Sequence, residues 1–226
     1  DHIIRVPVPS LFLGGHSLSS TAHWSGPVQQ QGVAAGTQFS SQSTMELGTV
    51  EEVKALAVST GRSYVRMVME QGGEILGSCL LELYTDITPA TCQHFLTGVG
   101  GKFKGGYQYE SSPIHRIVKN AYIQGGDVVD GTGKGNPGWA LPDETFAVKH
   151  TAPGLIGMAT CGEPHTAATQ FYITLQPLSW LDGKRVIFGG VVDAAGFELL
   201  RLVEGLSTNN ERPIPELTIK SIQLVC

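Results

Sequence analysis

Charged side chains are scarce in this chain. Asp, Glu, Lys and Arg make up 15% of its 226 residues, against about 25% in a typical soluble domain. The formal net charge is −5, and no cluster of Lys and Arg occurs, so the sequence predicts no nucleic-acid partner. No apolar run approaches the ~18 residues that a membrane-spanning helix requires. We therefore expect no membrane partner either.

Cysteine is also sparse and irregularly spaced. The four cysteines are Cys79, Cys92, Cys161 and Cys226, and no two of them form a CxxC pair. This spacing excludes zinc-ribbon and thioredoxin-like motifs. We expect free thiols in a reducing compartment, a cytoplasmic location, no metal site and no cofactor.

The first 48 residues differ in composition from the rest. From Val6 to Met45 there is no Asp, Glu, Lys or Arg, and Ser, Gln, Gly and Thr dominate without a helical or strand period. Such a segment cannot bury enough apolar surface to fold alone. We interpret residues 1–48 as an extended arm that docks on its own domain or on a larger protein assembly through Phe12, Trp24 and Phe39. The alternative is a loosely ordered tail.

Glycine and proline are plentiful, with 29 and 12 residues, which is typical of a turn-rich β protein. Thr49 and Glu52 have capping-box spacing and Gly61 is a stop signal, which predicts a short helix and linker over 49–62. A domain of alternating strands then spans 63–226, and Thr88 caps one of its helices, which begins at Pro89. Strands are predicted at 64–70, 74–84, 114–118, 121–124, 155–159, 171–174, 186–191 and 217–225, and helices from 88 to about 99 and from 196 to 205. The pattern favours a mainly β fold, a closed antiparallel barrel with two helices over its ends.

Several motifs occur together in one order and spacing. They are Ile114-His115-Arg116-Ile117-Val118, Gln124-Gly125-Gly126-Asp127, Lys149 to Gly154, Thr169 to Ile173, Trp180 to Lys184 and Val186 to Gly189. Over residues 63–226 the chain resembles the cyclophilin-type peptidyl-prolyl cis-trans isomerases. The resemblance implies an eight-stranded barrel that accelerates rotation about Xaa-Pro bonds in proline-containing peptides or proteins. Short strings around 116–120 and 209–213 are similar to a divergent isomerase-like subgroup associated with ciliated cells, which implies a cilium or flagellum axoneme as the location.

Prolyl isomerisation needs neither a nucleophile nor a metal. The planar Xaa-Pro bond has a rotation barrier of about 18–20 kcal/mol. A fixed hydrogen-bond donor aimed at the prolyl nitrogen binds the twisted state better than either planar state, and that difference lowers the barrier. Arg116 suits this role because its guanidinium is permanently charged and carries several donors. On a strand, Arg116 shares a face with Ile114 and Val118; the alternative reading is a surface ion pair.

The resemblance assigns roles to further positions. Gln124, which shares a strand face with Tyr122, would bind the substrate backbone and orient Arg116, and Gln170 would stand on the rim. Ala159 and Thr160 would lie along the bound peptide, Trp180 and Leu181 would border the proline pocket, and Gly131 would belong to a flexible loop beside the groove. The tryptophan also implies cyclosporin binding. The full set of expected substrate-binding residues is Ala121, Tyr122, Gly131, Ala159, Thr160, Cys161, Gln170, Tyr172, Trp180, Leu181 and Arg185, beside the catalytic pair Arg116 and Gln124.

Six of these positions depart from the family pattern. Ala121 and Tyr122 stand where the family has Phe and Met, and Tyr172 replaces a pocket Phe, which adds a hydroxyl that needs a partner. Arg185 replaces a His, and Thr160 and Cys161 replace Asn and Ala. We expect reduced or narrowed isomerase activity. The alternative is a non-catalytic proline-peptide-binding or scaffold module, held in an assembly by residues 1–48.

Overall fold

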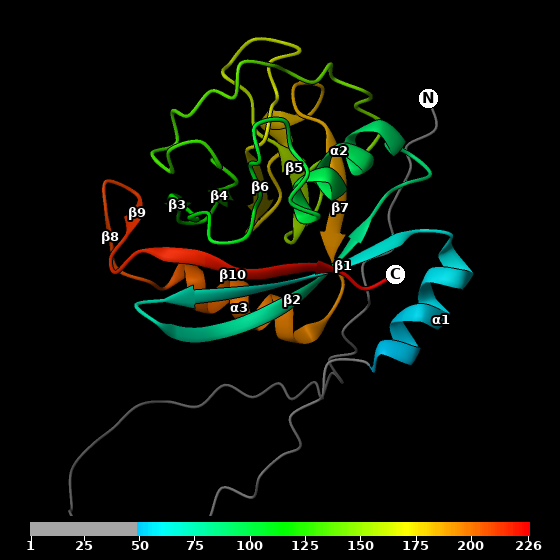
Figure 1. Cartoon of the computed structure of the whole chain (residues 1–226), viewed down its shortest axis with the longest axis horizontal. Helices are drawn as coiled ribbons and strands as arrows, with labels where there is room; N and C mark the ends of the chain where they lie inside the picture. The colour runs from blue at the N-terminus through cyan, green and yellow to red at the C-terminus, as the bar shows by residue number, and fades with distance from the viewer. Residues whose placement is uncertain (1–48) are drawn as a thin grey trace, which may run out of the picture.

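A computed structural model describes residues 49–226 as a curled antiparallel sheet with helices at its ends (Figure 1). The eight strands follow the order β10-β1-β2-β7-β5-β6-β4-β3. The expected docking of residues 1–48 lies outside the described residues. Among those described, no helix is both long and apolar enough to cross a membrane. The strands are β1 (Ser63–Gln71), β2 (Glu74–Leu83), β3 (Arg116–Val118), β4 (Tyr122–Gly125), β5 (Leu155–Met158), β6 (Phe171–Thr174), β7 (Ile187–Val191) and β10 (Leu217–Leu224).

The two edges of this sheet meet. Pro113, just before β3, forms a bridge with Thr218 of β10. The Ser111 N–H donates to the Ile219 carbonyl, and the Ile114 N–H donates to the Leu217 carbonyl, both at 2.8 Å. Closure of this kind protects the strand edges, and it confirms the predicted mainly β barrel.

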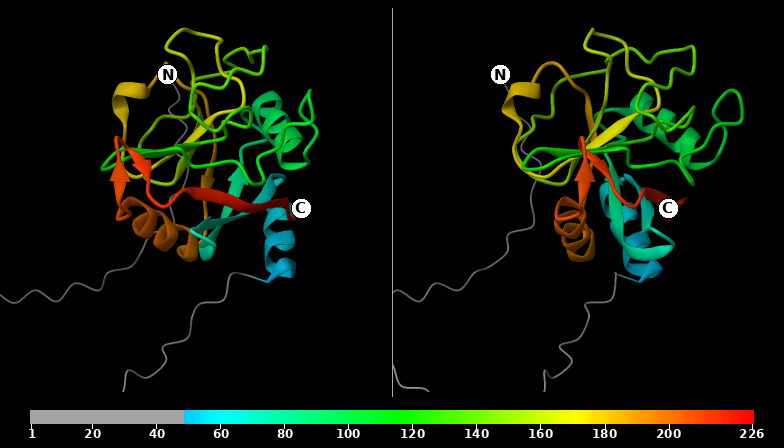
Figure 2. Two further views of the ribbon diagram at one scale, coloured as in Figure 1. Left: turned by 60° about the vertical axis from the view of Figure 1, so that its left-hand side comes forward. Right: turned by 90° about the vertical axis from the view of Figure 1, so that its left-hand side faces the viewer.

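Three α-helices and one 3-10 turn surround the sheet (Figure 2). All three α-helices were predicted from the sequence: α1 (Val50–Thr60), which precedes β1, α2 (Pro89–Val99) and α3 (Ala194–Glu204). The 3-10 turn η1 covers Ser179–Leu181. A small hairpin of β8 (Thr208–Asn209) and β9 (Arg212–Pro213) follows α3. The sequence analysis did not predict η1 or this hairpin, because each is only two or three residues long.

The helix ends follow the sequence signals in α1 but not in α2. Thr49 and Glu52 form the expected capping box, and Gly61 ends α1 in a left-handed conformation. The prediction that Thr88 caps α2 is wrong, because its hydroxyl donates to the Tyr84 carbonyl instead. A distant carboxylate, Glu144, accepts hydrogen bonds from the Ala90 and Thr91 N–H groups. Capping of α2 is therefore a tertiary contact that local spacing could not reveal.

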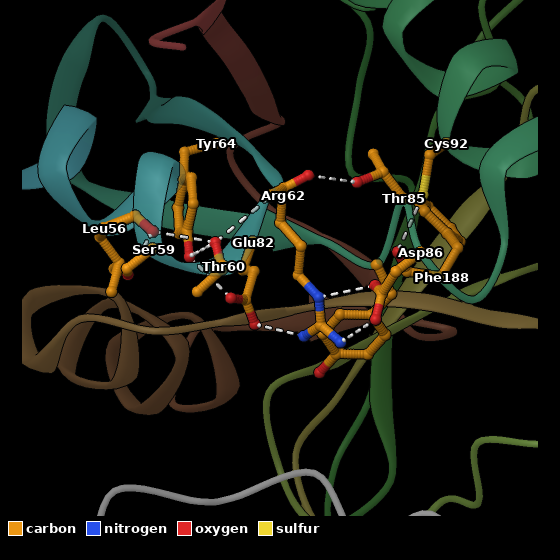
Figure 3. Close-up of polar contacts among 12 residues, drawn as sticks. Leu56, Ser59, Thr60, Arg62, Tyr64, Glu82, Thr85, Asp86, Cys92 and Phe188 are labelled. Carbon is orange, nitrogen blue, oxygen red and sulfur yellow. Dashed lines mark hydrogen bonds and ion pairs between the residues drawn. The ribbon is translucent and has the colours of Figure 1, made fainter.

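A half-buried arginine ties the end of α1 to the barrel (Figure 3). The Arg62 guanidinium binds both carboxylate oxygens of Asp86, at 2.7 and 2.9 Å, and an oxygen of Glu82 at 3.2 Å. It also lies over the Tyr84 ring, 4.6 Å from the centroid. The Tyr64 hydroxyl donates to the other Glu82 oxygen. Hydrogen bonding to Arg62 lowers the pKa of Asp86 below its usual range, although burial opposes that shift.

We expect the substitution Arg62→Ala to lower the free energy of unfolding by about 1–3 kcal/mol, because it leaves the half-buried Glu82 carboxylate without its cation. Urea denaturation of both proteins measures the difference. The loss should shrink as the pH falls through the native pKa of Asp86, since the protonated carboxyl no longer pairs with Arg62. Arg201→Ala, which removes an exposed ion pair on α3, should change stability by less than about 0.5 kcal/mol. Equal effects of the two variants would contradict this account.

Candidate active site

Four neighbouring strands arrange their side chains in two cross-strand rows. The paired residues Ile117, Ile123, Ile173 and Ile156 form one row across β3, β4, β6 and β5. All four are at most 1% exposed and belong to the main core. Because side chains alternate along a strand, the adjacent row faces outward. That outward row is Arg116, Gln124, Tyr172 and Gly157.

Arg116 stands at the end of the outward row on the edge strand β3. The expectation that it shares a face with Ile114 is wrong: β3 begins at Arg116, and Ile114 is fully buried in the core. The Arg116 Nε donates to Glu211 at 2.5 Å, and its Nη1 donates to the Tyr122 hydroxyl at 2.9 Å. Hydrogen bonding to Glu211 raises the pKa of Arg116, while burial opposes the shift. The guanidinium is therefore a permanent cation held by two partners.

Gln124 lies opposite Arg116 but does not contact its guanidinium. The Gln124 Nε2 donates to the Gln170 Oε1 at 2.9 Å, and the Gln170 Nε2 donates to the Gly133 carbonyl at 3.2 Å. The implied orienting role of Gln124 toward Arg116 is thus taken by Glu211 and Tyr122. Gln124 shares its face with Tyr122, as the alternation predicts. The two glutamines instead connect β4 to the loop at Gly133.

The hydroxyl group of Tyr172 is buried and has a hydrogen-bond partner. Its oxygen lies 2.6 Å from His150 Nε2, and His150 Nδ1 lies 2.8 Å from Asp182 Oδ1. A carboxylate only accepts, so the Nδ1 carries the proton and the Nε2 accepts from Tyr172. Burial lowers the pKa of His150 despite the opposing effect of Asp182, which keeps the ring neutral. The expected need for a hydroxyl partner is met.

The Tyr172 ring can lie across β5 only because residue 157 is glycine. A Cβ on Gly157 would stand 2.3 Å from the Tyr172 hydroxyl oxygen. On its other side, the Tyr122 ring centroid lies 5.6 Å from that of Tyr172. Tyr122, Ala159 and Leu181 pack against the small apolar cluster that contains Tyr172. These residues form a cup beside Arg116.

Three of the predicted substrate-binding residues do not pack in this apolar cluster. Ala121 is buried in the turn between β3 and β4, where its N–H donates to the Val118 carbonyl, so its methyl does not replace a ring. Trp180 is 57% exposed on η1. Arg185 is half-buried, and its Nη1 donates to the Lys184 carbonyl.

A cleft of about 690 Å³ lies next to the outward row. The loop 133–140 forms one wall and residues 159–161 and 168–170 form the other, with Gln124 at its end. Among the predicted contacts it gathers Gln124, Ala159, Thr160, Cys161 and Gln170. The Ala159 N–H donates to the Gln170 carbonyl at 3.0 Å, so only the Ala159 carbonyl can meet a ligand backbone.

Gly131 does not line this cleft. It faces a separate hollow with Pro113 and Arg212, and its carbonyl accepts from Arg212 Nη1 at 3.0 Å. The loop that carries it is also well tethered, since Asp127 accepts hydrogen bonds from four of its backbone N–H groups, those of Val129, Asp130, Gly133 and Gly135. The loop itself does border the cleft through Gly133, Lys134 and Gly135, while Gly131 lies outside its lining.

Residues 64–224 match the family model described as cyclophilin type peptidyl-prolyl cis-trans isomerase/CLD. The chain belongs to the cyclophilin family. A human relative named "Probable inactive peptidyl-prolyl cis-trans isomerase-like 6" is 43% identical over 147 residues, which are 62% of this chain and 46% of the human protein. The bovine protein of the same name is 40% identical over 152 residues, 64% of this chain and 48% of the relative. This cyclophilin chain thus spans about half the length of these curated relatives.

We expect Tyr172→Phe to lower the free energy of unfolding by about 1–3 kcal/mol, because it leaves the buried His150 Nε2 without a donor. Chemical denaturation measures the loss. Tyr122→Phe is the matched control: the Tyr122 hydroxyl contacts only the half-exposed Arg116, so its removal should cost less than about 1 kcal/mol. A Tyr172→Phe protein as stable as the parent would contradict the buried Tyr172–His150–Asp182 chain.

Proposed function

We propose that this cyclophilin domain binds proline-containing segments in the cleft and cup beside Arg116, and that it isomerises them slowly. The observation that carries the proposal is the state of Arg116. The guanidinium stands at the end of the outward row, next to the cup, but Glu211 and Tyr122 already bind two of its nitrogens. The residues needed to hold a peptide are present, while the donor needed to accelerate rotation is engaged.

Binding and catalysis make different demands on this site. A peptide can be held by the cleft walls, by the Ala159 carbonyl and by the apolar side of Tyr122 and Leu181. Such contacts stabilise planar and twisted states alike, so they give affinity without acceleration. Acceleration requires a donor that meets the prolyl nitrogen only in the twisted state. Each factor of ten in rate needs about 1.4 kcal/mol of that difference.

The names of the human and bovine relatives, which describe probable inactive isomerases, support the same emphasis on binding. The altered cup supports it too, because Tyr172 adds a hydroxyl that is bound to His150. Cyclosporin binding and a ciliary location rest on the sequence resemblance and stay predictions.

A peptide titration followed by NMR tests the proposal. An Ala-Pro peptide should shift the resonances of Gln124, Ala159 and Gln170, whereas a matched Ala-Ala peptide should shift them far less. Exchange spectroscopy of the same Ala-Pro sample should show weak acceleration of cis–trans exchange. We expect Arg116→Ala to abolish that acceleration and to change the dissociation constant by less than about threefold, since only the twisted state uses the donor.

Arg201→Ala is the matched control, because it removes an exposed arginine on α3, far from the cleft in sequence and paired only with Glu198. It should behave as the parent in both measurements. No resonance shift at the cleft with any proline peptide would contradict the proposed binding. Acceleration that survives in Arg116→Ala would contradict the assignment of the donor.

A further inference from the structure

The tip of the β8–β9 hairpin has an unusual residue. Asn209 pairs with Arg212, so the turn consists of Asn210 and Glu211, with φ values of 48° and 67°. Two-residue hairpin turns with positive φ at both positions favour Asn followed by Gly. A non-glycine residue in this left-handed region is disfavoured because its Cβ crowds the following carbonyl oxygen. Asn210 suits the turn, whereas Glu211 occupies the position where glycine would be unstrained.

The Glu211 side chain reaches the candidate donor. Its Oε2 accepts from Arg116 Nε at 2.5 Å, and both side chains are about half-exposed, at 44% and 42%. The Glu211 carbonyl separately accepts from the Ile117 N–H at 2.7 Å. The hairpin therefore docks on the edge strand β3 through its backbone, and the carboxylate is an additional contact made by the side chain alone.

Two contacts together fix the guanidinium. Glu211 holds Nε, and the Tyr122 hydroxyl accepts from Nη1 while the Tyr122 ring lies 5.6 Å from the guanidinium carbon. Within residues 49–226 this leaves Nη2 as the guanidinium nitrogen without a hydrogen-bond partner. The Glu211 carboxylate also partly neutralises the positive charge of Arg116. It thereby weakens the attraction of the guanidinium for the lone pair that develops on the prolyl nitrogen as the bond twists.

We propose that Glu211 is a positioning residue that restrains Arg116 and keeps the isomerase activity of this site low. This inference rests on the proposed function and adds its regulation. Glu211 and Tyr122 each bind one of the five N–H groups of the guanidinium. Turning Nε, Nη1 or Nη2 toward a twisted prolyl bond rotates the guanidinium against these contacts, and their loss adds to the barrier. Any event that draws the hairpin tip away from β3, such as binding of a basic segment to Glu211, would release the donor.

Two substitutions distinguish the effect of the Glu211 carboxylate from the effect of the turn conformation. Glu211→Gln keeps the shape and removes the charge, whereas Glu211→Gly suits the φ of the turn and removes the whole side chain. Neither disturbs the backbone bond to Ile117. Glu198→Gln is the matched control, since Glu198 also pairs with an arginine in an exposed ion pair but lies on α3 and contacts Arg201.

We expect exchange spectroscopy on the Ala-Pro peptide to show at least about tenfold faster catalysed exchange in both Glu211 variants, with the dissociation constant changed by less than twofold. Glu198→Gln should leave the rate unchanged. Without peptide, the Arg116 Nε–H resonance should move in Glu211→Gln relative to the parent, because its acceptor changes from a carboxylate to a neutral amide oxygen. The double variant Glu211→Gln with Arg116→Ala should lose the gain, since the gain acts through Arg116.

Other outcomes overturn the inference in distinguishable ways. Unchanged or slower exchange in Glu211→Gln, with peptide still bound, would overturn the restraint and leave the proposed binding intact. A gain that is equal in Glu198→Gln would overturn it as a non-specific charge effect. An Arg116 Nε–H resonance that is the same in the parent and in Glu211→Gln would overturn it whatever the peptide does. Failure of every variant to bind the peptide would overturn the proposed function and this inference together.

Discussion

The row of four isoleucines across β3, β4, β6 and β5 fixes everything else at the candidate site. Burial of one such side chain contributes about 1.5–3 kcal/mol, and all four are at most 1% exposed. A register slip of one residue would turn this row outward and move the polar row into the core. No hydrogen bond among the polar side chains could compensate for that loss. The positions of Arg116, Gln124 and Tyr172 are therefore set by residues that take no part in the chemistry.

Within the outward row, each side chain is then constrained by its neighbour. Tyr172 lies flat over β5 because Gly157 leaves room for it, and its hydroxyl is fixed by the neutral His150. The Tyr172 hydroxyl thus contacts His150, while the Tyr172 ring belongs to the apolar cluster. A buried tyrosine hydroxyl destabilises the fold unless it has a hydrogen-bond partner, and here the buried His150 provides the acceptor. His150 is in turn held by Asp182, in the turn after η1.

The sequence predicted those parts of the fold that depend on local patterns. Alternation located β1 and β2, and the strands predicted at 114–118, 121–124, 155–159 and 171–174 overlap β3, β4, β5 and β6. Contacts between distant segments were not predictable in this way. Glu144 caps α2 from 53 residues away, and Glu211 meets Arg116 across 95 residues. Nothing in the local sequence around either carboxylate indicates its partner, because the partner is chosen by strand order and hairpin docking.

The same distinction explains why a cyclophilin fold can persist while its catalysis varies. The cleft is built from backbone and from loops anchored by Asp127 and by the pair Gln124 and Gln170. These contacts belong to the folded state, so selection for stability alone preserves them. The donor is different: Arg116 is on an edge strand, its side chain is 42% exposed, and its partners come from one hairpin tip and one tyrosine. A substitution at that tip would change the charge around the guanidinium without disturbing the contacts that hold the barrel and the cleft together.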